Sequence, residues 1–326
     1  NLQLQLGRTE EAVQAAKDAK GLLPNTVEVH MTLARALLAK GDIAGAEPEL
    51  HAVLQQMPNN AAAHALNGVL LASKKDLRGA RAAFEQALQK NENLGEALNG
   101  LLALDMAAKN VTPAIARIEQ RVAKKPDDPG LQFIAARTYA AAGQLDKTEH
   151  ALRAVLQKDP DSLAAYAALG RLYASQHKLD AALNEIDTFL KRQPNHVGMG
   201  TMAGMILQLQ KKDEEAQKRY EAVIAINPRA AVAANNLAWL YAERGGNLDI
   251  ALHLAQTATA QLAEAPEVLD TLGWVYLKKN LPAEAVPFFE KSVAKDTKNA
   301  GYQYHLGLAY ARAGQKEKAR AALERA

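Results

Sequence analysis

The sequence predicts an all-α solenoid, a stack of helix–turn–helix units that repeat every 34 residues. Alanine recurs at one position of the period and large side chains recur at two others. Six prolines lie at multiples of 34 residues from one another, with Glu92 in the vacant place of the series: Pro24, Pro58, Pro126, Pro160, Pro194 and Pro228. Such a unit buries its apolar face only by stacking on its neighbours, so the repeat decides the fold.

Within a unit, position 1 is the third residue after the proline place. Position 11, in the expected first helix, carries a large residue, and Asp105 and Gln3 are the exceptions. The large residues are Leu37, Leu71, Tyr139, Tyr173, Leu207, Tyr241, Tyr276 and Tyr310. Position 15 is often a glycine that can adopt the left-handed conformation ending a helix. These glycines are Gly7, Gly41, Gly143, Gly245 and Gly314.

The expected second helix alternates small and large residues at helical spacing. Position 20 is alanine except at Thr148, and this row marks the closest approach of two helices: Ala12, Ala46, Ala80, Ala114, Ala182, Ala216, Ala251, Ala285 and Ala319. Position 24 adds large residues such as Phe84, Ile186 and Phe289. The proline at position 32 then ends the unit.

These spacings resemble the tetratricopeptide repeat, as in Leu169-Gly170, Tyr173, Leu179, Ala182 and Pro194. The resemblance spans residues 1–326 as a single array and implies a right-handed superhelix. A partial unit, 1–26, precedes complete units at 27–60, 61–94, 95–128, 129–162, 163–196, 197–230, 231–265 and 266–299, and another partial unit covers 300–326. The 231–265 unit has one extra residue, expected in the turn at Gly245-Gly246. The 95–128 unit, with Asp105, Lys109 and Pro113 off pattern, predicts a local irregularity of the superhelix.

Composition narrows the function classes. The net charge is +3 and the chain has no cysteine. Lysine pairs such as Lys124-Lys125 stand alone near turns, without a basic cluster or interleaved aromatics, which argues against nucleic-acid binding. No apolar run approaches the ~20 residues of a membrane span. The histidines lack metal-ligand spacing, and no nucleophile has a base beside it, so we expect no metal, no cofactor and no catalysis.

The resemblance implies that positions 2, 5, 9 and 12 of the first helices face a partner segment in a concave groove. Position 9 changes from arginine to the two tryptophans of the chain, which suit a binding hot spot. An alternative interpretation is that both indoles only pack between repeats. The candidate groove residues are Arg137, Arg171, Met205, Asn235, Asn236, Trp239, Asp270, Trp274, Tyr304 and His305.

The sequence therefore predicts a non-enzymatic scaffold or adaptor that holds a protein or peptide segment. Two alternatives stay open: a structural array that self-associates head to tail through its end repeats, and the targeting arm of a larger enzyme. The C-terminal units, Asn235 to Trp239, Asp270 to Trp274 and Tyr304 to Gly307, resemble large bacterial repeat proteins of export and exopolysaccharide systems. That resemblance favours a periplasmic or secreted protein, with a cytoplasmic one as the alternative.

Overall fold

A computed structural model describes residues 8–108 and 111–326 of the chain. All regular structure in these residues is helical, which confirms the predicted all-α solenoid. The chain divides into two compact units, residues 1–160 and 161–326, and each is described by itself. Its assignment to one continuous array stays a prediction.

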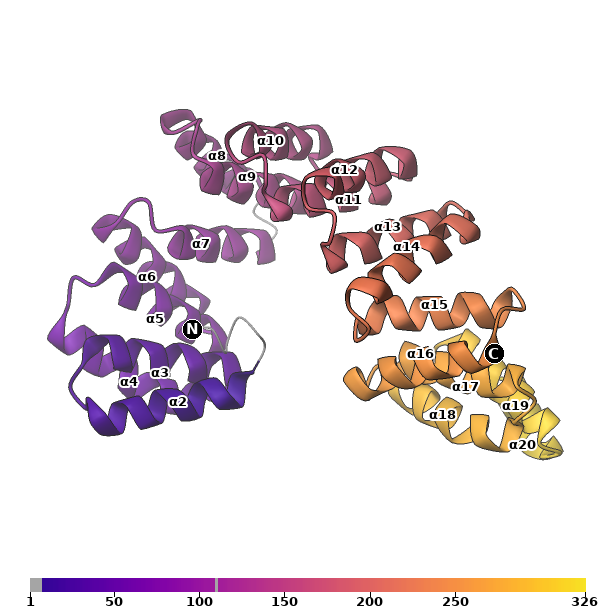
Figure 1. Cartoon of the computed structure of the whole chain (residues 1–326). Helices are drawn as coiled ribbons and strands as arrows, with labels where there is room; N and C mark the ends of the chain where they lie inside the picture. The colour runs from indigo at the N-terminus through magenta and orange to yellow at the C-terminus, as the bar shows by residue number, and fades with distance from the viewer. Residues whose placement is uncertain (1–7, 109–110) are drawn as a thin grey trace. The chain divides into compact units, whose positions relative to one another are not determined.

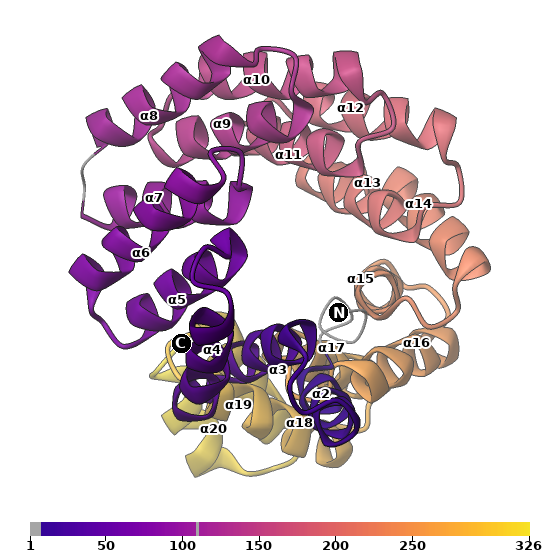
Figure 2. The same ribbon diagram turned by 90° about the vertical axis from the view of Figure 1, so that its left-hand side faces the viewer.

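The first compact unit is a series of helix pairs in which each helix packs on the next (Figures 1 and 2). Its helices are α2 (Thr9–Leu22), α3 (Val27–Lys40), α4 (Ile43–Gln56), α5 (Ala61–Ser73), α6 (Leu77–Lys90), α7 (Gly95–Ala107), α8 (Val111–Lys124), α9 (Pro129–Ala141) and α10 (Leu145–Lys158).

The second compact unit continues the same pattern of paired helices (Figure 1). Its helices are α11 (Leu163–Ser175), α12 (Leu179–Arg192), α13 (Val197–Leu209), α14 (Asp213–Ile226), α15 (Ala231–Glu243), α16 (Leu248–Gln261), α17 (Pro266–Lys278), α18 (Pro282–Lys295), α19 (Ala300–Arg312) and α20 (Lys316–Leu323). In both compact units, the first helices from α3 to α19 begin at position 1 of each repeat.

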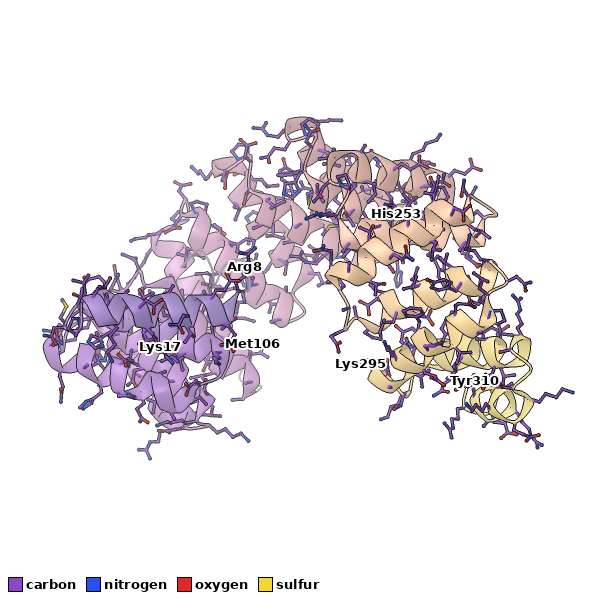
Figure 3. All side chains as sticks on the ribbon, turned by 60° about the horizontal axis from the view of Figure 1, so that its bottom comes forward. Arg8, Lys17, Met106, His253, Lys295 and Tyr310 are labelled. Atoms are coloured by element: carbon purple, nitrogen blue, oxygen red, sulfur yellow. The ribbon has the colours of Figure 1, made fainter. Side chains whose placement is uncertain are left out.

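Close contact between the two helices of a repeat depends on small residues. The alanines of position 20 are buried from Ala12 to Ala319. Glycine at position 8 makes room for the large residue at position 24. A Cβ added to Gly204 would lie 2.4 Å from the ring of Tyr220, and one added to Gly273 would lie 2.9 Å from that of Phe289. Figure 3 labels Tyr310, the position 11 residue of α19. It is buried like Leu37, Tyr139, Tyr173 and Leu207, whereas Leu71, Tyr241 and Tyr276 at this position are half-buried.

In every repeat whose turn is described, the first helix ends in a Schellman motif, in which the N–H of position 16 donates to the carbonyl of position 11. Position 15 is left-handed in every repeat whose turn is described: Gly41, Lys75, Gly143, His177, Lys211, Gly245, Asn280 and Gly314. Gly7 lies outside the described residues. The glycine prediction was therefore incomplete, because four non-glycine residues adopt the same conformation. The extra residue of the 231–265 repeat lies in the turn 244–247, as predicted.

The divergent 95–128 repeat places a carboxylate where other repeats have a large side chain. Asp105 is only 2% exposed. Its oxygens lie 2.6 Å from Arg81 Nη2 on α6 and 3.6 Å from Arg117 Nε on α8. The two arginines neutralise the buried charge, which explains how this substitution is tolerated. Lys109 lies outside the described residues, and the predicted irregularity of the superhelix stays a prediction.

Candidate functional site: an aromatic stack on three first helices

The first helices α15, α17 and α19 place three aromatic rings side by side in the second compact unit. We call Trp239, Trp274 and His305 the aromatic stack. The two indoles are stacked, with ring centroids 5.7 Å apart and planes at 24°. The His305 ring lies 4.4 Å from Trp274 and 5.9 Å from Trp239. All three side chains are half-buried, so they contact one another and still present a surface to solvent.

An ion pair fixes the second indole in this stack. Trp274 Nε1 donates a 2.7 Å hydrogen bond to Glu243 Oε1, on the preceding first helix. Lys278 Nζ lies 3.0 Å from the same oxygen and 5.0 Å from the Trp274 ring centroid, in cation–π range. Burial raises the pKa of Glu243, but the hydrogen bonds from Lys278 and Trp274 outweigh it and bring the pKa below its usual value. Glu243 is therefore ionised at neutral pH.

A buried carboxylate orients the imidazole of the stack. Asp270 is 5% exposed, and its two oxygens lie 3.0 and 2.9 Å from His305 Nδ1. Burial raises the pKa of Asp270 above its usual value, and the hydrogen bond with His305 opposes part of that increase. Asp270 is therefore a buried residue that positions the His305 ring and does not present its own charge at the surface.

Two asparagines extend the polar network one turn before Trp239. Asn236 Nδ2 donates to the hydroxyl of Tyr220 at 3.2 Å, and this hydroxyl donates to Gln208 Oε1 at 2.6 Å. Asn235 is 8% exposed, and its Nδ2 donates a long 3.4 Å bond to Asn236. Within the described chain, Asn235 Oδ1 is buried without a hydrogen-bond partner. A buried acceptor without a donor costs about 1–3 kcal/mol of folding stability. Because Asn235 is buried, this oxygen does not form part of the exposed surface around the aromatic stack.

The structure brings only some of the predicted residues together. Tyr304 is 48% exposed on α19, and its ring lies 6.0 Å from that of His305, at the edge of the stack. Met205 is 46% exposed on α13. Arg171 is exposed on α11 and Arg137 is exposed on α9, in the other compact unit. The basic stretch of the groove thus stays a prediction.

Glu243 and Lys278 were not among the residues predicted from the sequence. A signal was present, because each follows a tryptophan by four residues on the same helix face, Glu243 after Trp239 and Lys278 after Trp274. The two residues carry opposite charges on adjacent repeats, which suits a pair between repeats.

Other kinds of site find no support in the described residues. No cluster of three histidine, cysteine or acidic side chains there has the geometry to hold a metal ion. Over the same residues, every helix is too short or too polar to cross a membrane.

Comparison with solved structures supports the fold. A tetratricopeptide repeat protein from Parabacteroides merdae is 15% identical, covering 77% of this chain and 98% of its own, with a TM-score of 0.52. PilW, described as a widely conserved type IV pilus biogenesis factor, is 15% identical and PilF of Pseudomonas aeruginosa 17%. Each covers 60% of this chain, and 90% and 88% of its own, with a TM-score of 0.51. At these identities the likeness concerns the fold alone.

Sequence comparison gives the family. No curated protein matches the chain significantly. One family model of the tetratricopeptide repeat matches residues 3–70 and 139–199, and a second matches residues 242–300 and 271–326. Together these ranges cover more than half of the sequence. The chain therefore belongs to the tetratricopeptide repeat family.

Proposed function

We propose that this protein is a non-enzymatic scaffold that binds a partner segment across the aromatic stack of α15, α17 and α19. Tetratricopeptide repeat proteins bind protein partners and are generally non-enzymatic scaffolds. The partner segment is extended or helical and presents apolar or aromatic side chains to Trp239 and Trp274. The aromatic stack supports binding of such a segment.

The half-burial of both indoles in one contiguous stack carries the proposal. Neighbouring rings hold each indole in place, so little side-chain entropy is lost when a partner covers it. Tryptophan in a well-packed setting is typical of interface hot spots, and the exposed polar neighbours Glu243 and Lys278 supply a rim.

Binding is measured with peptides selected on the whole protein from a random peptide-display library, because the aromatic stack does not specify a partner sequence. We expect Trp239→Ala and Trp274→Ala each to weaken the binding of these peptides by about 2 kcal/mol, which is roughly a 30-fold increase in Kd. Phe288→Ala is the matched control. It removes another half-buried ring, stacked on Tyr276 with centroids 5.6 Å apart, outside the aromatic stack. Its peptide affinity is expected to stay unchanged.

A different result would show that the two indoles pack between repeats and do not bind a partner. If the tryptophan variants lose thermal stability, yet their folded fraction binds peptides as the parent does, the indoles only pack between repeats. Charge reversal of Arg137 and Arg171 to glutamate tests the basic stretch separately. It is expected to slow association and change its salt dependence rather than abolish binding.

A further inference from the structure

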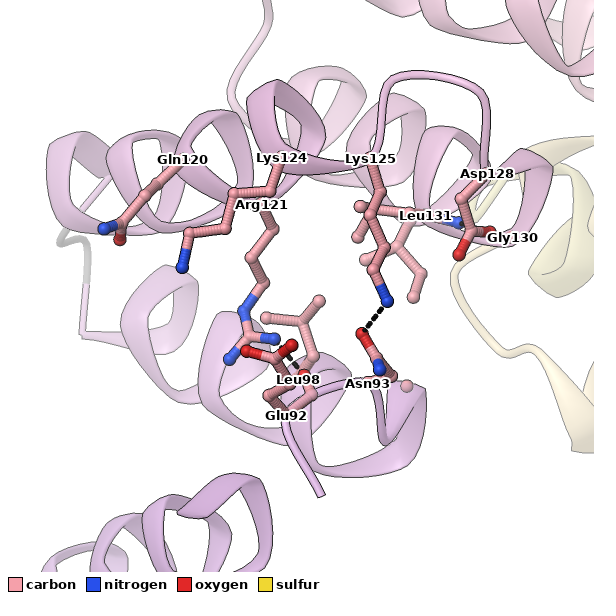
Figure 4. Close-up of a pocket in the computed structure, with 12 residues that line it drawn as sticks. Glu92, Asn93, Leu98, Gln120, Arg121, Lys124, Lys125, Asp128, Gly130 and Leu131 are labelled. Carbon is pink, nitrogen blue, oxygen red and sulfur yellow. Dashed lines mark hydrogen bonds between the residues drawn. The ribbon is translucent and has the colours of Figure 1, made fainter. Parts of the chain in front are cut away.

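A pocket of about 270 Å³ opens in the first compact unit, within the divergent repeat (Figure 4). It lies between the start of α7, the C-terminal end of α8 and the start of α9. Its apolar lining comes from Leu98, Leu131 and Ile134. This volume is slightly below the roughly 300–1,000 Å³ of typical small-molecule sites, so a small ligand suits it.

Arg121 lines the pocket at a repeat position that is otherwise part of the core. Position 27 is buried in neighbouring repeats, where it is Val53, Ala87, Val155, Phe189 and Val223. In the divergent repeat it is Arg121, which is only partly buried. Burial lowers the pKa of Arg121, so the guanidinium lies in a partly dehydrated environment.

Arg121 makes a hydrogen bond that some other repeats make from position 4. His30, His64 and Gln132 hydrogen-bond the carbonyl at position 32 of the preceding repeat, at 2.8, 2.7 and 2.7 Å. Position 4 here is Leu98, and Arg121 Nη1 donates to the Glu92 carbonyl instead (Figure 4). A guanidinium has five N–H donors, so this bond leaves others for a ligand.

Two lysines add positive charge to the rim. Lys125 Nζ donates to Asn93 Oδ1 at 2.7 Å. Lys124 is exposed at the pocket and has no ion-pair partner in the described chain. The two acidic residues of the pocket lining already have partners. Asp128 accepts the Leu131 N–H at 3.0 Å as a helix cap, and Glu92 faces Arg121. The rim is thus net positive above an apolar floor.

We propose that this pocket binds a small amphiphilic carboxylate. The carboxylate pairs with Arg121 and Lys124, and its short apolar tail covers Leu98, Leu131 and Ile134. A guanidinium fork recognises a carboxylate by two parallel hydrogen bonds, and the partly dehydrated site strengthens them. The site is separate from the aromatic stack, so it does not depend on the proposed scaffold function.

Octanoate is the probe, titrated into the full chain with ¹³C-labelled isoleucine and leucine methyl groups. Shifts are expected at Ile134, Leu98 and Leu131, and neither uncharged 1-octanol nor acetate is expected to reproduce them. Arg121→Leu should raise the Kd for octanoate by about tenfold or more, because it removes a charge-assisted hydrogen bond. Lys124→Ala should raise it several-fold.

Lys90→Ala is the matched control, since Lys90 occupies the same repeat position as Lys124, is exposed and lies outside the pocket. Its Kd should equal that of the parent. Lys124→Ala keeps the test valid if Arg121→Leu disturbs folding. Absence of methyl shifts at millimolar octanoate, equal shifts with 1-octanol, or equal Kd changes in Lys124→Ala and Lys90→Ala would overturn the proposal.

Discussion

The left-handed residue at position 15 of each repeat allows a stabilising substitution to be designed at Lys75. Its φ is +65°, in the region that glycine adopts without a steric penalty. The conformation costs an L-residue about 1–2 kcal/mol. The side chain is exposed and makes no ion pair with a described residue, so Lys75→Gly removes strain without removing a contact.

The size of the gain follows from two opposing contributions. Relief of the left-handed strain contributes about 1–2 kcal/mol, and the larger entropy that glycine loses on folding takes back about 0.5–1 kcal/mol. We therefore expect Lys75→Gly to raise the free energy of unfolding by about 0.5–1 kcal/mol. Lys211, at φ +60°, should respond equally, and Asn280, at +61°, should gain less because asparagine tolerates this region.

Urea unfolding followed by far-ultraviolet circular dichroism measures the change, and hydrogen exchange of α5 and α6 amides locates it in one repeat. Ala142→Gly is the matched control, because Ala142 has an ordinary φ of −85° one residue before left-handed Gly143. The free energy of unfolding of Ala142→Gly should fall by about 1 kcal/mol. Gly143→Lys should also be destabilising, by torsional strain alone, since a Cβ there meets no atom within 4 Å. A Lys75→Gly midpoint that falls as far as that of Ala142→Gly would refute the reasoning.

Three further substitutions test the buried polar groups. Arg81→Met is expected to cost about 3 kcal/mol in urea unfolding because it deprives the buried Asp105 carboxylate of its 2.6 Å partner. Asp105→Leu should be neutral or stabilising, because the arginines it leaves unpaired, Arg81 and Arg117, are partly exposed and stay hydrated. Similar losses in both variants would contradict this. Burial raises the pKa of Asp270 despite the hydrogen bond from His305, so its ionisation lowers stability as the pH rises through that pKa. Asp270→Asn should therefore raise the Tm at pH 7 and weaken the pH dependence of the Tm on the acidic side, and a lower Tm at pH 7 would argue against the sign. Tyr220→Phe leaves the half-buried amides of Gln208 and Asn236 without the hydroxyl they contact, and it should cost about 1–2 kcal/mol in urea unfolding. An unchanged midpoint would show that water replaces the hydroxyl.

Much of the fold follows from the sequence because a solenoid makes its contacts between residues at fixed separations. Alanine at position 20 and a large residue at position 11 must meet once two helices pair, whatever the rest of the chain does. The turn was harder to predict. Gly143 signals a left-handed residue by its type, but Lys75 does not, and only the Schellman hydrogen bonds around it impose that conformation.

The sequence alone determined that Trp239 and Trp274 occupy the same position of adjacent repeats, and that position 27 of one repeat is Arg121. The tertiary structure decided what these residues touch. His305, from another position of the next first helix, α19, closes the aromatic stack. Arg121 donates to the Glu92 carbonyl, a bond that the side chain of Leu98 cannot make. The periodicity fixes which helix faces meet, but side-chain rotamers and the rotation between neighbouring repeats decide which atoms come into contact.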